Sequence, residues 1–220
     1  MSIKQLKNRL SNNSGSMGIY LSISFIVIIF SIIAVSFTSI ERTLMMRDKV
    51  IQASQDTLSV AARDVDPTCL AHQQDYILTS PLGAQPDAYT VFANDFGNIS
   101  GMNLASESLS GNGASFVYTP SQPYSYGNID MNMVVYNTAP CLGPGGETLP
   151  ANATTGEVIP SGQPCGGDSL SGASVCLQTK IPVIINVMGM HGSMNNVKTT
   201  YTSNFLEKAN YFNQSTQQFN

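Results

Sequence analysis

Apolar residues fill one unbroken stretch near the start of the chain. Residues 15–40 contain no charged side chain, and residues 25–35 are almost entirely Phe, Ile and Val. A helix of about 20 residues rises about 30 Å, which is the thickness of a bilayer's hydrocarbon core. In lipid, only a helix satisfies all its backbone groups within one segment. The pattern therefore predicts a transmembrane helix over residues 15–40, preceded by a short basic cytoplasmic tail, residues 1–14.

A cleaved signal peptide is the alternative interpretation of this stretch. However, the apolar run is longer than the roughly 7–15 residues of a signal peptide's apolar region. No small-x-small cleavage site follows it in residues 36–41, and the helical pattern continues beyond it. These features favour a retained anchor, although they leave open whether the N-terminus is processed.

The helical pattern does not stop at the expected membrane surface. Between Glu41 and Asp64 there is no Gly or Pro, and apolar or small residues recur at steps of three and four. The pair Asp66-Pro67 ends this pattern, because a residue before proline is pushed out of the α region. We therefore expect an amphipathic extension over residues 41–66, giving one helix of roughly 45 residues, or about 70 Å.

Beyond Pro67 the pattern changes to short apolar runs separated by Gly, Pro, Asn and Ser. Such punctuation is typical of strands and turns. The predicted strands are Tyr89–Ala93, Ser115–Thr119, Met131–Asn137, Ser174–Thr179, Ile181–Met188 and Asn196–Ser203, the last two forming a hairpin. Pro182 should place its strand at an edge or an entry position. The predicted fold class is α+β: the long N-terminal helix, then a strand-rich, disulfide-stapled extracytoplasmic domain over residues 67–220.

The four cysteines all follow the apolar stretch, which suits an oxidising compartment. We expect Cys69, Cys141, Cys165 and Cys176 to form two disulfides. Three pairings are available, and we expect Cys141–Cys165 to close the Gly/Pro-rich loop between them, with Cys69–Cys176 as the second bond. Basic residues lie on both sides of the apolar stretch, so the cysteines decide the orientation: N-terminus inside, C-terminal domain periplasmic or extracellular, in the inner (cytoplasmic) membrane.

Charge excludes one class of partner. All ten basic residues lie within residues 4–63 or 180–208, so every charged residue from Asp64 to Thr179 is an Asp or a Glu. Such a surface repels a phosphate backbone, and we therefore expect no nucleic-acid partner.

One segment has the appearance of catalytic chemistry. Residues 167–172, Gly-Asp-Ser-Leu-Ser-Gly, resemble the GDSL block of serine esterases, in which Ser169 would be the nucleophile. His191 is the one downstream histidine, and no Asp stands three residues before it. A serine without a base is not a nucleophile. We therefore expect a Gly/Ser turn, with an anchored hydrolase as a remote alternative.

Metal and cofactor sites are likewise not expected. The two histidines, His72 and His191, have unrelated neighbours, and the cysteines lack the Cys-x-x-Cys spacing of zinc sites. The acidic residues do not follow the spacing of an EF-hand loop. We predict no enzymatic activity, no cofactor and no metal.

The first sixty residues together carry a family resemblance. The basic tail, the apolar stretch and the following helix, with Gln52, Ala53, Asp56, Ala61 and Ala62, resemble the TadE/TadG-like proteins of tight-adherence (Flp-type) pilus systems. The resemblance covers less than a third of the chain. It implies a structural or assembly component of a Tad-like pilus or secretion apparatus, similar to a minor pseudopilin.

The resemblance has one informative departure. Processed pseudopilins carry Glu at the fifth position after the cleaved Gly, whereas the fifth residue is Ile23 after Gly18 and Tyr20 after Gly15. The resemblance therefore implies an uncleaved, TadG-like member.

The expected mechanism is packing. Ala53, Ser54, Thr57 and Ala61 form a stripe of small residues, and such stripes let neighbouring helices approach closely. We expect these four residues to contact other pilus or pseudopilin subunits, or further copies of this chain, while the lipid bilayer holds the anchor. The alternative function is a membrane-anchored binding or adhesin module.

Overall fold

The structure of the chain is a computed structural model. It describes all residues except 1–2, 73, 80–85, 122–126, 144, 189–193, 210–211, 214–217 and 220. The chain divides into two compact units. The first contains residues 1–44 and 185–197, and the second contains residues 45–184 and 198–220.

Helix α1 spans Ile3–Ala61, 59 residues without interruption. It thus includes most of the predicted cytoplasmic tail, whose residues were expected to precede the helix. At the other end it stops short of the expected Asp66, because the backbone N–H groups of Arg63 and Asp64 bond to carbonyl groups only three residues back. This tightened turn is a common helix ending.

The next helix, α2 (Pro67–Ala71), is capped at its N-terminus by Asp66. The Asp66 carboxylate accepts hydrogen bonds from the backbone N–H groups of Thr68 and Cys69, and Pro67 occupies the first helical position. An N-terminal cap of this kind satisfies N–H groups that a helix itself leaves unpaired. The Asp66-Pro67 pair therefore separates two helices, as well as ending the pattern of the first.

Helix α3 (Ala88–Ser100) corrects one prediction, because the segment Tyr89–Ala93 was expected to be a strand. Asp87 caps its N-terminus by accepting from the Thr90 N–H, and Gly101 ends it in the left-handed region with φ 69°. The buried side chains recur at steps of one, three and four, which is a helical spacing. These are Ala88, Tyr89, Phe92, Ala93, Phe96 and Ser100.

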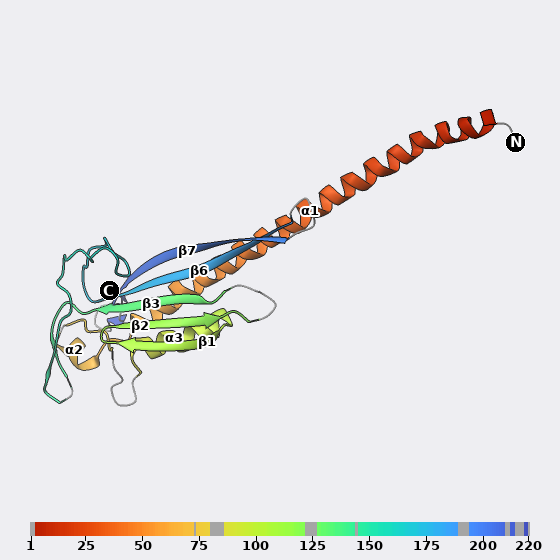
Figure 1. The fold of residues 1–220 in the computed structure, drawn as a ribbon. Coiled ribbons are helices and arrows are strands. Elements are labelled where there is room, and N and C mark those ends of the chain that lie inside the picture. Colours follow the sequence, from red (N-terminus) through yellow and green to blue (C-terminus); the bar gives the residue numbers. More distant parts are fainter. Residues whose placement is uncertain are drawn as a thin grey trace. The chain divides into compact units, whose positions relative to one another are not determined.

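Five strands form the main sheet, in the order β1-β2-β3-β6-β7 (Figure 1). Their bounds are β1 Asn103–Ser110, β2 Gly113–Thr119, β3 Ile129–Tyr136, β6 Ser174–Met188 and β7 Met194–Lys208. Neighbouring strands are antiparallel from β1 through β6. Short two-residue pairs also occur: β4 (Cys141–Leu142) with β5 (Thr148–Leu149), and β8 (Phe212–Asn213) with β9 (Gln218–Phe219).

The predicted strands in the second half of the chain are largely confirmed. Ser115–Thr119 lies in β2, Met131–Asn137 corresponds to β3, and the expected hairpin is the neighbouring pair β6 and β7. Two predicted strands, however, join into the single strand β6, which runs through Pro182. The pairing of β6 with β3 ends at Lys180, so Pro182 lies beyond that ladder, where its missing N–H is tolerated.

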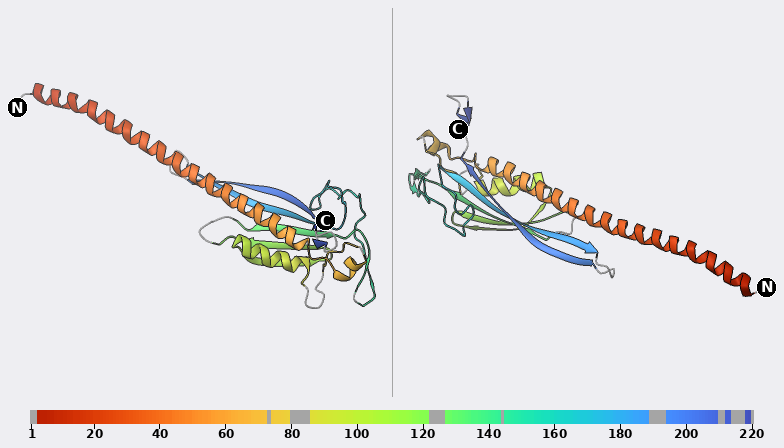
Figure 2. Two further views of the ribbon diagram at one scale, coloured as in Figure 1. Left: turned by 180° about the vertical axis from the view of Figure 1, so that it is seen from behind. Right: turned by 90° about the horizontal axis from the view of Figure 1, so that it is seen from above.

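The hydrophobic core lies on one face of the sheet in the second unit. Helix α3 and the last part of α1, from Met46 on, cover this face (Figure 2). Every second side chain of β2 and β3 is buried beneath them, as period-two alternation requires. The buried strand residues are Ala114, Phe116, Tyr118, Ile129, Met131, Met133 and Val135. The rings of Phe92 and Phe96 on α3 contact those of Phe116 and Tyr118 on the sheet.

Candidate functional site

The segment of α1 from Gly18 to Ile40 exposes apolar side chains in all directions around the helix. Phe25 is 69% exposed, Phe30 67% and Phe37 71%. The most apolar window of 18 residues has a mean hydropathy of 2.6, and none of it is buried. A helix on the surface of a soluble domain normally shows one apolar stripe, whereas an all-round apolar helix needs a core or a membrane around it. By length and composition this helix can cross a membrane.

Three hydroxyl groups of this segment are satisfied within the helix itself. The side chains of Ser22, Ser31 and Thr38 donate to the backbone carbonyl oxygens of the residues four positions earlier, at 2.8–3.1 Å. In hydrocarbon an unpaired hydroxyl would be costly, and this internal bonding removes that cost. These three side chains therefore add no unpaired hydroxyl to the apolar surface of the segment.

Beyond this segment, α1 becomes part of a domain core. Val50, Ala53, Leu58 and Ala61 are at most 2% exposed. The same stretch is tied to the sheet's edge, because the Arg47 guanidinium lies 5.3 Å from the centre of the Tyr201 ring on β7. Cation–π contacts of this kind contribute about 0.5–1 kcal/mol at exposed sites. One continuous helix thus supplies both the exposed apolar surface and part of the core.

The predicted packing residues have a different position from the one expected. Ala53, Ser54, Thr57 and Ala61 are all buried within the chain's own second unit, and Ser54 lies against Thr179 of β6. Small side chains are needed here because the helix packs closely on the sheet of the same chain. The expectation that these four residues contact neighbouring subunits is therefore corrected: they are already covered.

The disulfide pairing also corrects the prediction. The bonds are Cys69–Cys141 and Cys165–Cys176, in place of Cys141–Cys165 and Cys69–Cys176. All four cysteines are paired, as expected. The first bond joins α2 to β4. The second joins the loop of residues 156–170, which contains Cys165, to β6. The pairing depends on which cysteines the sheet brings close together. Their spacing along the chain does not reveal this.

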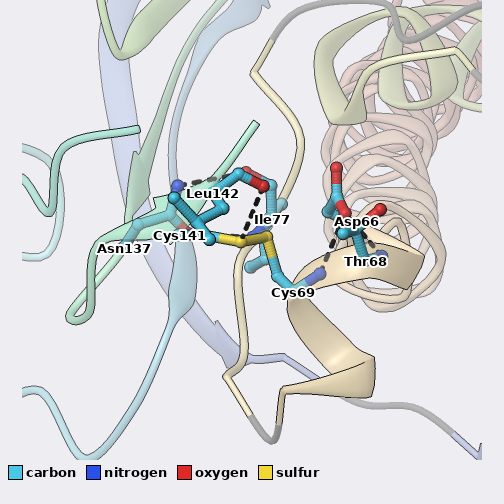
Figure 3. The surroundings of a disulfide bond; sticks show 7 residues. All are labelled: Asp66, Thr68, Cys69, Ile77, Asn137, Cys141 and Leu142. Carbon is cyan, nitrogen blue, oxygen red and sulfur yellow. Dashed lines mark hydrogen bonds between the residues drawn. A yellow bond between two sulfur atoms is a disulfide. The ribbon is translucent and has the colours of Figure 1, made fainter. Parts of the chain in front are cut away.

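An asparagine that the sequence did not single out fixes the surroundings of the first disulfide (Figure 3). The side chain of Asn137 accepts a hydrogen bond from the Ile77 N–H at 2.8 Å and donates to the Ile77 carbonyl oxygen at 3.0 Å. It therefore pairs with the Ile77 backbone as a neighbouring strand would. Asn137 is 2% exposed, so this two-way bond satisfies groups that would be costly to bury alone.

The segment expected to be a Gly/Ser turn forms one side of a narrow loop. Ser169 forms an isolated bridge with Val158, and its hydroxyl donates to the Gly156 carbonyl oxygen at 3.4 Å. His191 lies outside the described residues. Among the residues that the structure describes, no group of three or more His, Cys, Asp or Glu side chains could hold a metal ion.

A small pocket lies between this loop and the sheet. It has a volume of about 240 Å³, and its lining combines side-chain amides, a phenol and a carboxylate with apolar side chains. Its lining residues are Asn112, Val134, Tyr136, Asn152, Ala153, Glu157, Ile159, Pro160, Gln163 and Leu170. Burial raises the pKa of Tyr136 above its ordinary value, and the nearby Glu157 carboxylate adds to the effect. No sequence motif marks this pocket, because its walls come from four separate segments.

Comparison with known protein families, with curated proteins and with solved structures finds no match to this chain. The fold itself defines a class: an α+β protein with a long apolar N-terminal helix, a five-stranded antiparallel sheet and two disulfides.

Proposed function

We propose that this protein is a structural subunit anchored in the inner membrane of a bacterium, similar to a minor pseudopilin, within a Tad-like pilus or secretion apparatus. Its N-terminus lies in the cytoplasm, and its disulfide-stapled domain lies in the periplasm or outside the cell. One observation carries the proposal. Helix α1 exposes apolar side chains over residues 18–40 and enters the domain core over its last part, without a break between the two.

A continuous helix has a mechanical consequence that a linker lacks. A tether built from Gly, Ser or Pro would let the outer domain move freely. Here the same helix that would lie in lipid also packs on the sheet of the second unit through Val50, Ala53 and Leu58. Force or displacement applied to the anchor therefore reaches the domain core directly. Such coupling suits a subunit that is inserted, held and extracted during assembly.

The location of the domain follows from its bonds. Two disulfides and no free cysteine among the described residues suit an oxidising compartment. With the domain outside the cytoplasm and one span, the short N-terminal segment lies inside. The native cysteines are buried, so a cysteine introduced at the exposed Asn98 tests this orientation. In intact spheroplasts, a membrane-impermeant thiol reagent should label the Asn98→Cys variant. Protection until lysis would contradict it.

The experiment that tests the function is deletion of the gene with complementation. Loss of surface pili or adherence on deletion, restored by the wild-type chain, is the expected result. A double variant, Ile29→Asp with Ile33→Asp, should fail to restore either, because each charge at the centre of a span costs about 2.5–3.5 kcal/mol on insertion. The matched control, Ile29→Leu with Ile33→Leu, keeps the segment apolar and should restore both.

Two results would contradict this role. If deletion leaves pili, secretion and adherence intact, the chain is not a required subunit of such an apparatus. If the double Asp variant stays in the membrane after alkaline carbonate extraction, the exposed helix is not what holds the protein there.

The second candidate function is a membrane-anchored binding module, and the pocket beside Tyr136 favours it. A binder does not need to assemble with other copies. It would therefore leave piliation unchanged on deletion, while contact with a specific ligand or surface is lost.

A further inference from the structure

The pocket between the sheet and the stapled loop has the form of a small binding site. Tyr136 at the end of β3 and Asn112 in the turn between β1 and β2 contribute one side, and the loop contributes Glu157 and Gln163. Its volume, about 240 Å³, lies below the roughly 300–1,000 Å³ of pockets for drug-sized ligands. The occupant is therefore limited to about one small ring.

Several polar groups of this pocket are not used by the fold. The Asn152 amide is committed, since it accepts from the Asn137 N–H and donates to the Val135 carbonyl oxygen. One carboxylate oxygen of Glu157 accepts a hydrogen bond from the Thr154 N–H, so the other oxygen of that carboxylate is left to bind a ligand. The side chains of Asn112 and Gln163 are exposed and take part in no hydrogen bond to another described residue.

Charge decides which ligands these groups can accept. No Lys or Arg lines the pocket, and none occurs in the sequence from Asp64 to Thr179. An anionic ligand would meet the Glu157 carboxylate without a compensating cation. Phosphates, carboxylates and sulfated groups are therefore disfavoured as ligands of this pocket.

The remaining groups match a polyhydroxylated ring. Sugar hydroxyls both donate and accept hydrogen bonds, as side-chain amides do, and they donate to a carboxylate oxygen. The aliphatic face of a sugar ring can lie on apolar and aromatic side chains such as Val134 and Tyr136, which line the same pocket and are partly exposed. Glu157 is exposed, so it offers an amine only a solvated charge pair, which is worth little.

The loop that carries Glu157 and Gln163 is held in place. Backbone bonds join Gly156 to Leu170, Leu170 to Glu157, and Ile159 to Asp168, forming a narrow two-sided loop. The disulfide Cys165–Cys176 fixes this loop to β6. A site on a constrained loop loses less entropy on binding than one on a free loop.

We propose that this pocket binds a single neutral monosaccharide unit, free or at the end of a glycan. The proposal goes beyond the structural role above and holds whether or not the chain assembles into a pilus. It assigns hydrogen bonding to Glu157, Gln163 and Asn112, with Tyr136 and Val134 forming the apolar contact.

Saturation-transfer difference NMR on the full chain in phosphatidylcholine nanodiscs tests it, since sugar-based detergents would compete. The probes are D-glucose, D-galactose, D-mannose and N-acetyl-D-glucosamine, with N-acetylneuraminic acid as the anion and methylamine as the cation. At least one neutral sugar should bind, and the anion should not. Gln163→Ala removes a neutral hydrogen bond and should weaken the affinity for the bound sugar about 2- to 10-fold. Glu157→Gln removes a charged hydrogen bond and should weaken the same affinity about 10-fold.

Asn98→Ala, an exposed amide on α3 outside the pocket, is the matched control and should leave the affinity unchanged. Peptide mapping of both disulfides in every variant excludes misfolding as the cause of a loss. Three results would overturn the proposal. The first is binding of methylamine and of no sugar, and the second is sugar binding that neither pocket variant weakens. The third is no sugar binding at a 50-fold molar excess of sugar over protein, a concentration in roughly the millimolar range of weak ligands. Piliation plays no part in this readout, so its failure is distinct from failure of the structural role.

Discussion

The hydroxyl groups of Ser54 on α1 and Thr179 on β6 meet inside the core, with their oxygens 3.5 Å apart and both side chains fully buried. The two residues are 125 positions apart in the sequence. Their contact places the small-residue face of α1 directly on the sheet of the same chain. The stripe of small residues, which suggested contacts between subunits, therefore packs inside a single subunit.

This pair predicts a non-additive mutant cycle. Ser54→Ala should lower the free energy of unfolding by about 1 kcal/mol, because the Thr179 hydroxyl loses its buried partner. Adding Thr179→Val should recover part of that loss, since neither polar group is then left unpaired. Thermal unfolding of the full chain in detergent measures the cycle. Strict additivity of the two single changes would show that the hydroxyls do not interact.

A larger side chain on the same face of α1 should destabilise the fold of the single chain, whether or not the chain assembles with others. Ala61→Leu forces extra carbons into a filled site at 0% exposure and should cost about 1–3 kcal/mol. Gln55→Leu, on the exposed side of the same helix, is the matched control and should change stability by less than about 0.5 kcal/mol. Equal effects of the two changes would mean that Ala61 is not enclosed.

The two disulfides should differ in their contributions to stability. Cys69–Cys141 spans 72 residues and Cys165–Cys176 spans 11, so loop-closure entropy predicts losses of about 4 and about 3 kcal/mol, respectively, when each pair is replaced by serine. Non-reducing peptide mapping of the wild-type chain should recover these two bonds. A Cys141–Cys165 peptide would contradict the structure.

Alkaline pH should destabilise the second unit. Burial raises the pKa of Tyr118 and of Tyr89 above their ordinary value of about 10, and the charges of Glu107 and Asp87 add to the effect. Above pH 10 the unfolded state therefore releases protons that the folded state keeps. Stability is complete below about pH 10 and falls as the pH rises beyond it, by up to about 1.4 kcal/mol per unit for each tyrosine.

Thermal unfolding between pH 8 and pH 11 measures this dependence, with Tyr118→Phe as the variant. The change removes the hydroxyl that donates to the Ala93 carbonyl oxygen, so it lowers stability slightly at neutral pH while flattening the alkaline decline. An unchanged slope in the variant would exclude Tyr118 as a cause.

The sequence by itself determined the features that depend on local spacing. The apolar run, the helical steps after Glu41 and most strands of the sheet follow from periods of 3.6 and 2. The helix itself ends at Ala61, before the expected stop at Asp66-Pro67. The even cysteine count likewise indicated two disulfides. Helix α3 was missed because a short aromatic and β-branched segment reads equally well as a strand, and its caps at Asp87 and Gly101 decided the outcome. Strand β1 was missed because all eight of its side chains are exposed, so it carries no pattern of burial.

Only the tertiary structure decided which distant residues meet. It paired Cys69 with Cys141 and Cys165 with Cys176, covered Ala53 and Ala61 with the chain's own sheet, and brought four segments together around Tyr136. A helix stripe of small residues has the same sequence pattern whether its partner is a second subunit or a strand of its own chain. The partner is set by the long-range packing that lowers the free energy of the whole core, and local spacing carries no record of it.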